Sequence, residues 1–295
     1  MLGLLGRRLF YLIPVLLAVT ALTFVVANLL PGDLAIAMLG DQATPENVAA
    51  LHKKLGLDLP LWQQYFHWLG GVLTGDFGTS HRTGETVLRA ISGRLPVSLE
   101  LMIIAELGGI LIGMPLAVLC AMRPGSAFDR ACSAVAFAML SVPPFMLAIL
   151  LIFIFALRLG VLPATAYVPF TQDVIGNLRA MVLPGATLAL LEWPTIMRVL
   201  RSDMISTLQE DYIAMARAKG LTARRILFVH ALKPSSLTLV TVIGLNIGRL
   251  IGGAVITESI FALPGIGRLL VESIYGALRA IPVGELGSDR AQGAG

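Results

Sequence analysis

Charged residues are scarce in this chain of 295 residues: 14% are Asp, Glu, Lys or Arg, whereas soluble domains average about 25%. Hydrophobic residues make up 56% of the sequence, and the mean hydropathy is +0.83. Stretches that contain few charged residues form long apolar runs. This pattern indicates a membrane protein rather than a soluble domain.

Residues that bind metals or form disulfides are also few. The only cysteines, Cys120 and Cys132, lie in apolar surroundings and are read as small hydrophobic residues near one membrane face. His52, His67 and His81 are 15 and 14 residues apart, which is not the local spacing of metal ligands. We therefore expect no metal site.

The sequence has no G-x-x-x-x-G-K-[ST] loop to cradle a phosphate. It also has no Ser/His/Asp or paired-carboxylate arrangement, so we expect neither catalysis nor a bound cofactor in this chain. The net charge is +4, but no Lys/Arg patch alternates with aromatic residues. The positive charge is therefore assigned to the cytoplasmic face of a membrane rather than to nucleic-acid binding.

A transmembrane helix needs about 20 apolar residues, and five segments meet this requirement. They are residues 9–30, 97–122, 127–157, 181–200 and 237–257. The first could instead be a signal peptide cleaved after "AIA" at 35–37. Because its apolar core is about twice the usual ~7–15 residues, we favour a retained span.

Residues 31–94 are too polar to cross a membrane and too long for a tight connection. "PENVAALHKKLGL" predicts a helix that follows Thr44, has Pro45 in its first turn and ends near Gly56. "LPLWQQYFHWLGGVL" predicts a second, amphipathic helix with aromatic residues on one face. We expect a small helical extramembrane domain here.

The orientation follows from the short loops, because cytoplasmic loops are enriched in Lys and Arg. A cytoplasmic N-terminus places eleven basic residues inside: Arg7, Arg8, Arg123, Arg130, Arg198, Arg201, Arg217, Lys219, Arg224, Arg225 and Lys233. The short loop between the third and fourth spans then has only Arg158 and Arg179 outside. Residues 31–94 are therefore expected outside, and residues 211–232 inside.

That inner stretch, "DYIAMARAKGLTARRILFVHAL", predicts two short helices. The spacing of Thr207 and Glu210 matches a capping box that begins the first helix. Gly220 suits the left-handed position that ends it. Thr222 can cap the second helix, which is expected to stop before Pro234.

Each of these helices has a distinct set of surface residues. In the first, Leu208, Tyr212 and Met215 fall on one face, and a second face of smaller residues holds Ile213, Ala216 and Gly220. In the second, Arg224 and Arg225 lie in the first turn, where the helix dipole disfavours cations. A compensating anion is therefore expected, and the residues alone leave open whether it is lipid headgroups or an acidic protein partner.

Within the spans, Pro143-Pro144 removes two backbone donors, so the helix must kink or open there. This is either a hinge that lines a path or a packing kink. Three ionisable residues are expected within the membrane: Glu106, Glu192 and Arg249. Such residues are costly to bury in lipid, so they are taken as candidates for a functional role. Arg249 could pair with either glutamate, to line a path or to form a structural ion pair. Glu100 and Glu258 are expected to reach water.

"YIAMARAKGLTARRILFVHAL" resembles the coupling loop, or EAA-type motif, of ABC importer permeases. Ala216 and Gly220 match the second alanine and the glycine of that motif. Ala214 stands at the glutamate position, as in the dipeptide/oligopeptide branch. Four further stretches resemble that branch in order: "RRLFYLIPVLLAVTALTFVVANLLPGD", "LGLDLPLWQQYFHWLGGVLTGDFGTS", "SVPPFMLAILLIFIFALRLGVLPATAY" and "LIGGAVITESIFALPGIGRLLVESIY". The resemblance covers about residues 7–276.

The resemblance implies an all-α polytopic protein with the type I ABC importer permease fold, in a bacterial or archaeal inner membrane. It implies four partners: a second permease, two ATP-binding subunits that carry ATP and Mg, and an external substrate-binding protein. Membrane lipid surrounds the chain. The substrates of this branch are dipeptides, oligopeptides or nickel.

The resemblance also assigns roles to residues. The residues expected to couple this chain to the ATP-binding subunits are Ala214, Ala216, Arg217, Lys219, Gly220, Arg224 and Arg225. From their place in the spans rather than from the resemblance, the residues expected along the translocation path are Glu106, Pro143, Pro144, Glu192 and Arg249.

The chain departs from the family after "VESIY", where a sixth span is normally found. "GALRAIPVGELGSDRAQGAG" contains no apolar run of span length. The expected division is residues 1–30, an outer domain 31–96, a core 97–258 with the coupling loop 206–234, and an atypical segment 259–295. The alternatives to an importer permease are a stand-alone transporter or channel, and a truncated inactive permease.

Overall fold

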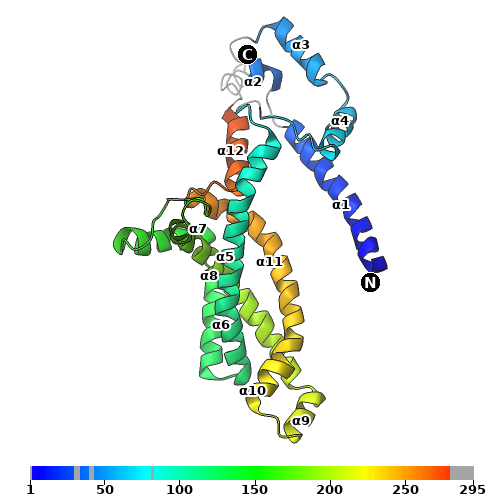
Figure 1. Ribbon diagram of the computed structural model, residues 1–295. Coiled ribbons are helices and arrows are strands. Elements are labelled where there is room, and N and C mark those ends of the chain that lie inside the picture. Colours follow the sequence, from blue (N-terminus) through cyan, green and yellow to red (C-terminus); the bar gives the residue numbers. More distant parts are fainter. Residues whose placement is uncertain (1, 30–33, 40–42, 81–82, 280–295) are drawn as a thin grey trace, which may run out of the picture. The chain divides into compact units, whose positions relative to one another are not determined.

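The computed structural model describes residues 2–29, 34–39, 43–80 and 83–279, and this part of the chain is helical apart from its turns, its loops and an isolated bridge between Thr79 and Thr86. Figure 1 shows the order of the helices. The chain divides into two compact units, residues 93–272 and residues 1–92 with 273–295. Each unit is described separately.

The unit formed by residues 1–92 contains four helices and the start of a fifth. They are α1 (Leu2–Asn28), α2 (Leu34–Leu39), α3 (Pro45–Leu55), α4 (Leu61–Leu73) and the first turn of α5 (Val87–Met122). The predicted signals of α3 are confirmed: Thr44 Oγ1 accepts the Asn47 N–H, Pro45 is the first helical residue, and Gly56 ends the helix at φ 68°.

Aromatic residues join α4 to α1. The ring of Phe24 lies 5.6 Å from that of Tyr65 and 6.0 Å from that of Trp68, centroid to centroid. Tyr65 Oη also lies 2.9 Å from Thr20 Oγ1. Trp62 and Phe66 remain exposed, so the aromatic residues of α4 occupy two faces rather than the single face expected.

The unit formed by residues 93–272 contains most of α5 and the helices that follow it, the last of which continues beyond Glu272 into the other unit. The helices after α5 are α6 (Ala127–Leu140), α7 (Pro144–Leu151), α8 (Val174–Leu208), α9 (Asp211–Ala218), α10 (Ala223–Arg225), α11 (Leu232–Ile260) and α12 (Ile266–Arg279). Two π-helical segments extend α7 and join α10 to α11: η2 (Ile152–Arg158) and η3 (Ile226–Ala231).

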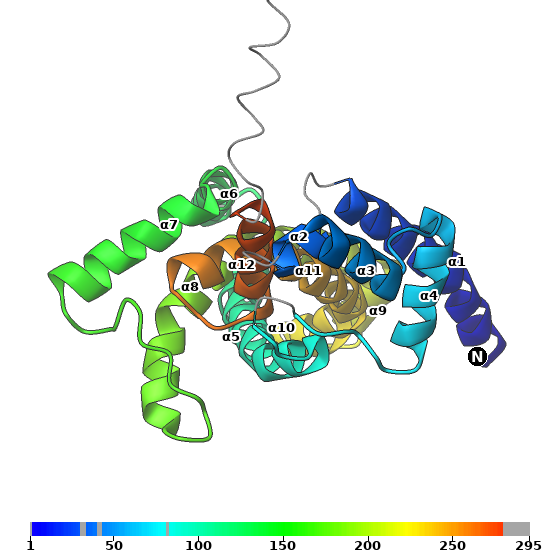
Figure 2. The same cartoon turned by 90° about the horizontal axis from the view of Figure 1, so that it is seen from above.

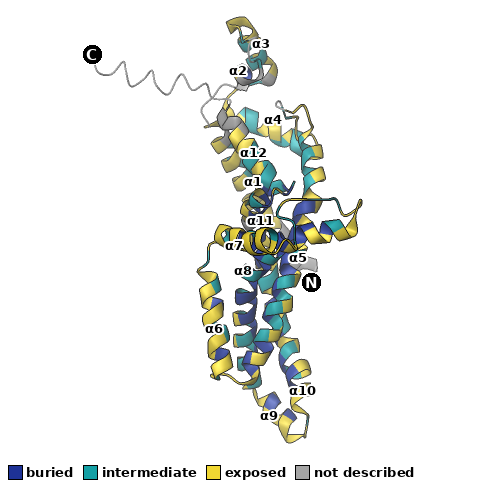
Figure 3. Cartoon of the chain, turned by 90° about the vertical axis from the view of Figure 1, so that its left-hand side faces the viewer, coloured by how far each residue is buried: buried dark blue, intermediate teal, exposed yellow. Residues whose placement is uncertain are grey.

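Helix α8 is at the centre of this unit. Glycines on α5 allow the two backbones to approach closely, since a Cβ at Gly113 would lie 2.9 Å from the Trp193 carbonyl oxygen. A glycine on α8 has the same effect, because Gly185 faces Ile104 of α5. Figure 3 shows the consequence, with buried residues along α8 and mostly exposed residues on α6.

The paired prolines break the third predicted span. Helix α6 ends at Leu140, Pro143 caps the next helix, and Pro144 is the first residue of α7. The axes of the two helices differ by 102°. In Figure 2, α6 is seen almost end-on while α7 runs across the view. The expected kink is therefore confirmed, and it is a sharp break.

Three described helices are long and apolar enough to cross a membrane: Val87–Met122, Val174–Leu208 and Ala223–Gly252. The bent pair α6 and α7–η2 is a fourth if it is counted as one span. The apolar part of α1, Phe10–Val26, is shorter than these. Four of the five predicted segments thus coincide with long apolar helical stretches.

Candidate functional site

The hairpin of α9 and α10 is the first candidate site. Gly220 ends α9 with φ 74°, and Thr222 Oγ1 accepts the Arg225 N–H at the start of α10. Both signals were predicted from the sequence. The hairpin lies at one end of its unit, beyond the ends of α8 and α11 (Figure 1).

A small apolar core fixes the hairpin. Ile213 and Ala216 of α9 are buried against Ile226 of η3, with Leu208 and Leu221 packed around them. This changes the role expected of Ala216. Its methyl group points into the hairpin and shapes it from within, whereas a docking surface was expected.

The outward surface is formed by other residues. The exposed positions include Ala214, Met215, Arg217, Lys219, Arg224 and Arg225. This surface combines small and apolar groups with four cations, and it can accept an acidic partner. Of the residues expected at the coupling site, Ala216 is therefore the buried exception.

Two expected boundaries of the hairpin are wrong. The capping box at Thr207 does not begin a helix, because α8 continues to Leu208 and α9 begins after Glu210. The second helix does not stop before Pro234: η3 leads directly into α11. A proline in a helix leaves the carbonyl four residues earlier without its donor. That carbonyl belongs to His230, and the Tyr212 hydroxyl of α9 donates to it at 2.9 Å.

The charged residues within the spans lie on three neighbouring helices. Arg249 Nη2 of α11 is 3.6 Å from Glu192 Oε1 of α8, so Glu192 is the partner among the two glutamates that the sequence left open. Glu106 of α5 is buried, and both of its carboxylate oxygens lack a hydrogen-bond partner among the described residues. Glu192 Oε2 is likewise buried without a hydrogen-bond partner among the described residues.

The side chain of Arg249 is 59% exposed although it lies in an apolar helix. Pro143 and Pro144 are elsewhere, at the break between α6 and α7. The structure thus brings together three of the five residues expected along the path, and it places the two prolines at a separate feature.

A second charged cluster surrounds Glu258, which sequence reasoning expected to reach water. Its side chain is fully buried. Glu258 Oε1 accepts the Ser98 hydroxyl at 2.6 Å, and Oε2 accepts the Arg268 backbone N–H at 3.0 Å. The Ser98 oxygen in turn accepts the Ile266 N–H at 2.9 Å. The carboxylate therefore joins α5 and α11 to the start of α12.

The glycines of "LPGIGR" make this cluster possible. A Cβ at Gly265 would overlap the Glu258 carboxylate, and one at Gly267 would crowd Val255 and Glu258. The signal in the sequence was an acid near the end of an apolar run, followed by two glycines. This stretch was among those that resemble the family, but the hydrogen bonds of Glu258 were not predicted.

Three charged residues extend the cluster. Glu272 Oε1 accepts from Arg268 Nε at 2.9 Å, and Oε2 accepts from Arg94 Nη1 at 3.1 Å. Burial alone would raise the pKa of Glu272, but these two hydrogen bonds hold that pKa below the usual 4.5. Arg268 also donates to the Ala262 carbonyl at 2.8 Å.

A further ion pair joins α6 to α8. Asp129 accepts two hydrogen bonds from the Arg201 guanidinium and a third from the Gly125 N–H. Asp129 is buried. Such a bidentate pair fixes the relative position of two helices. From the sequence, Arg201 was assigned only to the cytoplasmic charge.

In the described part of the chain, no three His, Cys, Asp or Glu side chains are grouped as metal ligands would be. His52 Nδ1 lies 3.6 Å from Asp58 Oδ1 on α3 and the turn after it. His67 is on α4, and His81 lies outside the described residues.

Comparison with known proteins identifies two matching family profiles. Residues 113–281 match the binding-protein-dependent transport system inner membrane component. Residues 1–102 match the N-terminal part of membrane components of the same transport systems. Together these matches cover most of the chain, and the first alone covers more than half of it.

Several relatives are similar over nearly the whole chain. A putative peptide transport system permease protein of Brucella abortus is 40% identical over 283 residues, covering 96% of this chain and 90% of the relative. The dipeptide transport system permease protein DppB of Escherichia coli is 37% identical over 292 residues, covering 91% and 86%.

Among solved structures, one of an amino acid ABC transporter aligns with 64% of this chain at 16% identity and a TM-score of 0.45. The family profiles and the curated relatives are much stronger matches. They make this chain a non-catalytic, multi-pass component of an inner membrane. The chain belongs to the family of inner-membrane permeases of binding-protein-dependent ABC transport systems.

Proposed function

We propose that this permease carries dipeptides or closely related small peptides inward across the membrane. The relatives that match almost end to end are named for peptide and dipeptide transport. On this proposal the chain works with a second permease, two ATP-binding subunits and an external binding protein. ATP and Mg are bound by the ATP-binding subunits.

The observation that carries the coupling role is the α9–α10 hairpin with a small apolar core of its own. Its own core of Ile213, Ala216 and Ile226 lets it move as one piece with η3 and α11. Its exposed surface carries Arg217, Lys219, Arg224 and Arg225. An acidic groove on an ATP-binding subunit would neutralise these cations, two of which oppose the dipole of their own helix. We assign this role to the hairpin in preference to lipid binding.

The topology we propose follows from the distribution of basic residues. The N-terminus and the α9–α10 hairpin are cytoplasmic, and the helices α2–α4 form an external domain. Helix α1 is a fifth span in addition to the four apolar helical segments. The exposed Arg249 beside Glu192 faces the water-filled path, because a cation facing lipid is disfavoured by about 2.5–3.5 kcal/mol or more.

Site-specific crosslinking tests the coupling role, with both variants made in a background in which Cys120 and Cys132 are replaced by alanine. Ala214→Cys places a thiol on the exposed face of α9, and Ala216→Cys places one in the core of the hairpin. We expect crosslinks to the ATP-binding subunit from position 214 and few from position 216. Because both sites lie on the same short helix, the difference reports the docking face.

Equal crosslinking from the two positions would contradict the docking face. No crosslink from either, combined with peptide transport in proteoliposomes that lack ATP-binding subunits, would instead support a stand-alone transporter. Peptide uptake that requires both ATP and those subunits is the result expected of the proposed function.

A further inference from the structure

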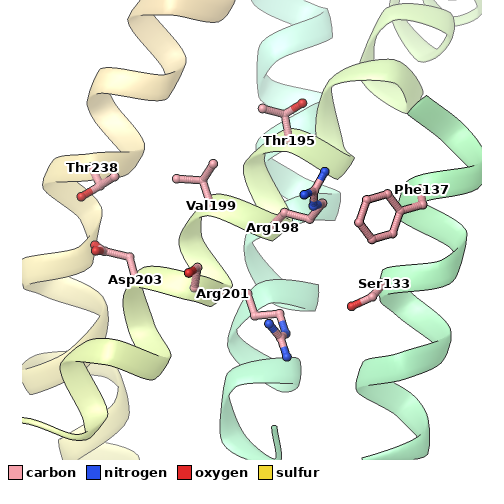
Figure 4. Close-up of a pocket in the computed structure, with 9 residues that line it drawn as sticks. Ser133, Phe137, Thr195, Arg198, Val199, Arg201, Asp203 and Thr238 are labelled. Atoms are coloured by element: carbon pink, nitrogen blue, oxygen red, sulfur yellow. The ribbon is translucent and has the colours of Figure 1, made fainter. Parts of the chain in front are cut away.

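A groove of about 660 Å³ lies over one face of α8 in the half of the helix that leads to the hairpin. Thr195, Arg198 and Val199 of α8 form its floor (Figure 4), and Ser202 of the same helix also lines it. Phe137 of α6 and Thr238 of α11 stand on its two sides. The volume falls within the range of ~300–1,000 Å³ that is typical of small-molecule sites.

The two sides of the groove carry opposite charges. Arg198 extends toward α6, where its guanidinium carbon lies 4.3 Å from the centre of the Phe137 ring. Asp203 extends to the other side, toward Thr238 of α11. Arg201 also lines the groove, but Asp129 already neutralises it. Arg198 and Asp203 therefore remain as one cation and one anion.

Neither charge has an ion-pair partner within the described ranges. The hydroxyl groups of Thr195 and Ser202 also line the groove, and they too make no hydrogen bond to any described residue. Unpaired polar groups gathered in a largely apolar helix bundle favour a polar ligand or water.

A ligand that meets both charges must lie across the face of α8. Arg198 and Asp203 are five residues apart on this helix, which separates their positions by about 7.5 Å along the axis and about 140° around it. A free peptide has a carboxylate at one end and an ammonium group at the other, so its two ends match the cation and the anion.

We propose that this groove is a binding site for small zwitterions, specifically free di- or tripeptides on their way through the permease. The peptide carboxylate binds Arg198, its ammonium group binds Asp203, and the hydroxyls of Thr195 and Ser202 serve the backbone between them. This assignment rests on the proposed function of peptide import, and it adds a contact site within this chain.

A protection experiment tests the site directly in the assembled transporter. In the background without Cys120 and Cys132, Ser202→Cys places a thiol in the lining of the groove. We expect free Ala-Ala to slow the labelling of this thiol by a small maleimide. N-acetyl-Ala-Ala amide, which has no terminal charge, should give little protection.

Variants of Arg198 and Asp203 test which end of the peptide each residue binds. Arg198→Gln should weaken protection by Ala-Ala about ten-fold and by Ala-Ala amide much less, because the amide already lacks the carboxylate. Asp203→Asn should weaken protection by Ala-Ala to a similar degree and by N-acetyl-Ala-Ala much less. Arg198→Lys keeps the cation and should retain most of the protection. A thiol at Arg123→Cys, in the α5–α6 turn, controls for effects outside the groove.

Equal protection by the charged and the blocked peptide, or protection by acetate or phosphate alone, would overturn the zwitterion site. Peptide uptake by the unaltered transporter without any protection of Ser202→Cys would overturn this inference and leave the proposed function standing. A transporter that neither takes up Ala-Ala nor binds it would contradict the proposed function itself.

Discussion

At the scale of single residues, Glu258 shows how an ionisable group is accommodated inside an apolar bundle. Burying an unpaired carboxylate costs several kcal/mol. Glu258 avoids this because Ser98 and the Arg268 N–H donate to its two oxygens, and because Gly265 leaves room for the carboxylate. Glu106 has no such donors among the described residues. The two buried acids are therefore accommodated differently, Glu258 by donors from two other elements and Glu106 without a donor among the described residues.

This contrast gives a prediction for Gly265→Ala. The added methyl group would overlap the Glu258 carboxylate, so at least one of its hydrogen bonds must be lost. We expect a destabilisation of ~1–3 kcal/mol, measured as a lower melting temperature of the purified transporter in detergent. The matched control is Gly93→Ala, since a Cβ there meets nothing within 4 Å. Identical melting temperatures for the two variants would show that the carboxylate is not held in place.

At the scale of elements, the α9–α10 hairpin depends on one glycine and on one hydroxyl. Gly220 supplies the left-handed residue that turns the chain between the helices. Tyr212 satisfies the carbonyl that Pro234 leaves without a donor, and this bond ties α9 to the helix that becomes α11. We therefore expect a displacement of α9 to be transmitted to α11, in which Arg249 faces Glu192 of α8.

Substitutions at Gly220 test the backbone conformation of the turn without creating a steric clash. Nothing lies within 4 Å of a Cβ at this position, so Gly220→Ala acts through backbone strain of about 1–2 kcal/mol. We expect Gly220→Ala to reduce the peptide taken up per ATP hydrolysed, measured in proteoliposomes, with normal membrane insertion. Gly220→Asn should be closer to the unaltered protein, because asparagine tolerates a positive φ. Equal coupling ratios for all three proteins would contradict a role for this turn.

At the scale of the whole molecule, the proposed topology places the polar region after α1 and the turn after α5 on opposite sides of the membrane. Glu46 of α3 and Arg123 after α5 are both exposed. They are thus suitable reporters of the two sides.

We expect Glu46→Cys to react with an impermeant maleimide added outside intact spheroplasts, and Arg123→Cys to react only after permeabilisation. The background lacks Cys120 and Cys132. Both thiols should react in permeabilised membranes, which controls for accessibility. Labelling of Arg123→Cys in intact spheroplasts would reverse the orientation that the basic residues predict.

The sequence by itself determined the class of protein and the positions of its main helices. The length of an apolar run is enough to predict a span. Helix-capping residues act within a few residues of their own positions, as Thr44, Gly56, Gly220 and Thr222 do. For that reason the α3 boundaries, the turn of the hairpin and the break at the prolines are predicted correctly. The motif that resembles a coupling loop needs no tertiary information.

Only the tertiary structure decided which side chains meet. It placed Ala216 inside the hairpin, paired Arg249 with Glu192, enclosed Glu258 and carried the helix through Pro234. Each of these outcomes depends on a group far away in the sequence, such as Ser98 for Glu258. Periodicity shows which face of a helix is apolar, but a hydrogen bond between distant residues depends on how the helices pack. That packing is fixed by contacts such as those of the glycines of α5 against α8.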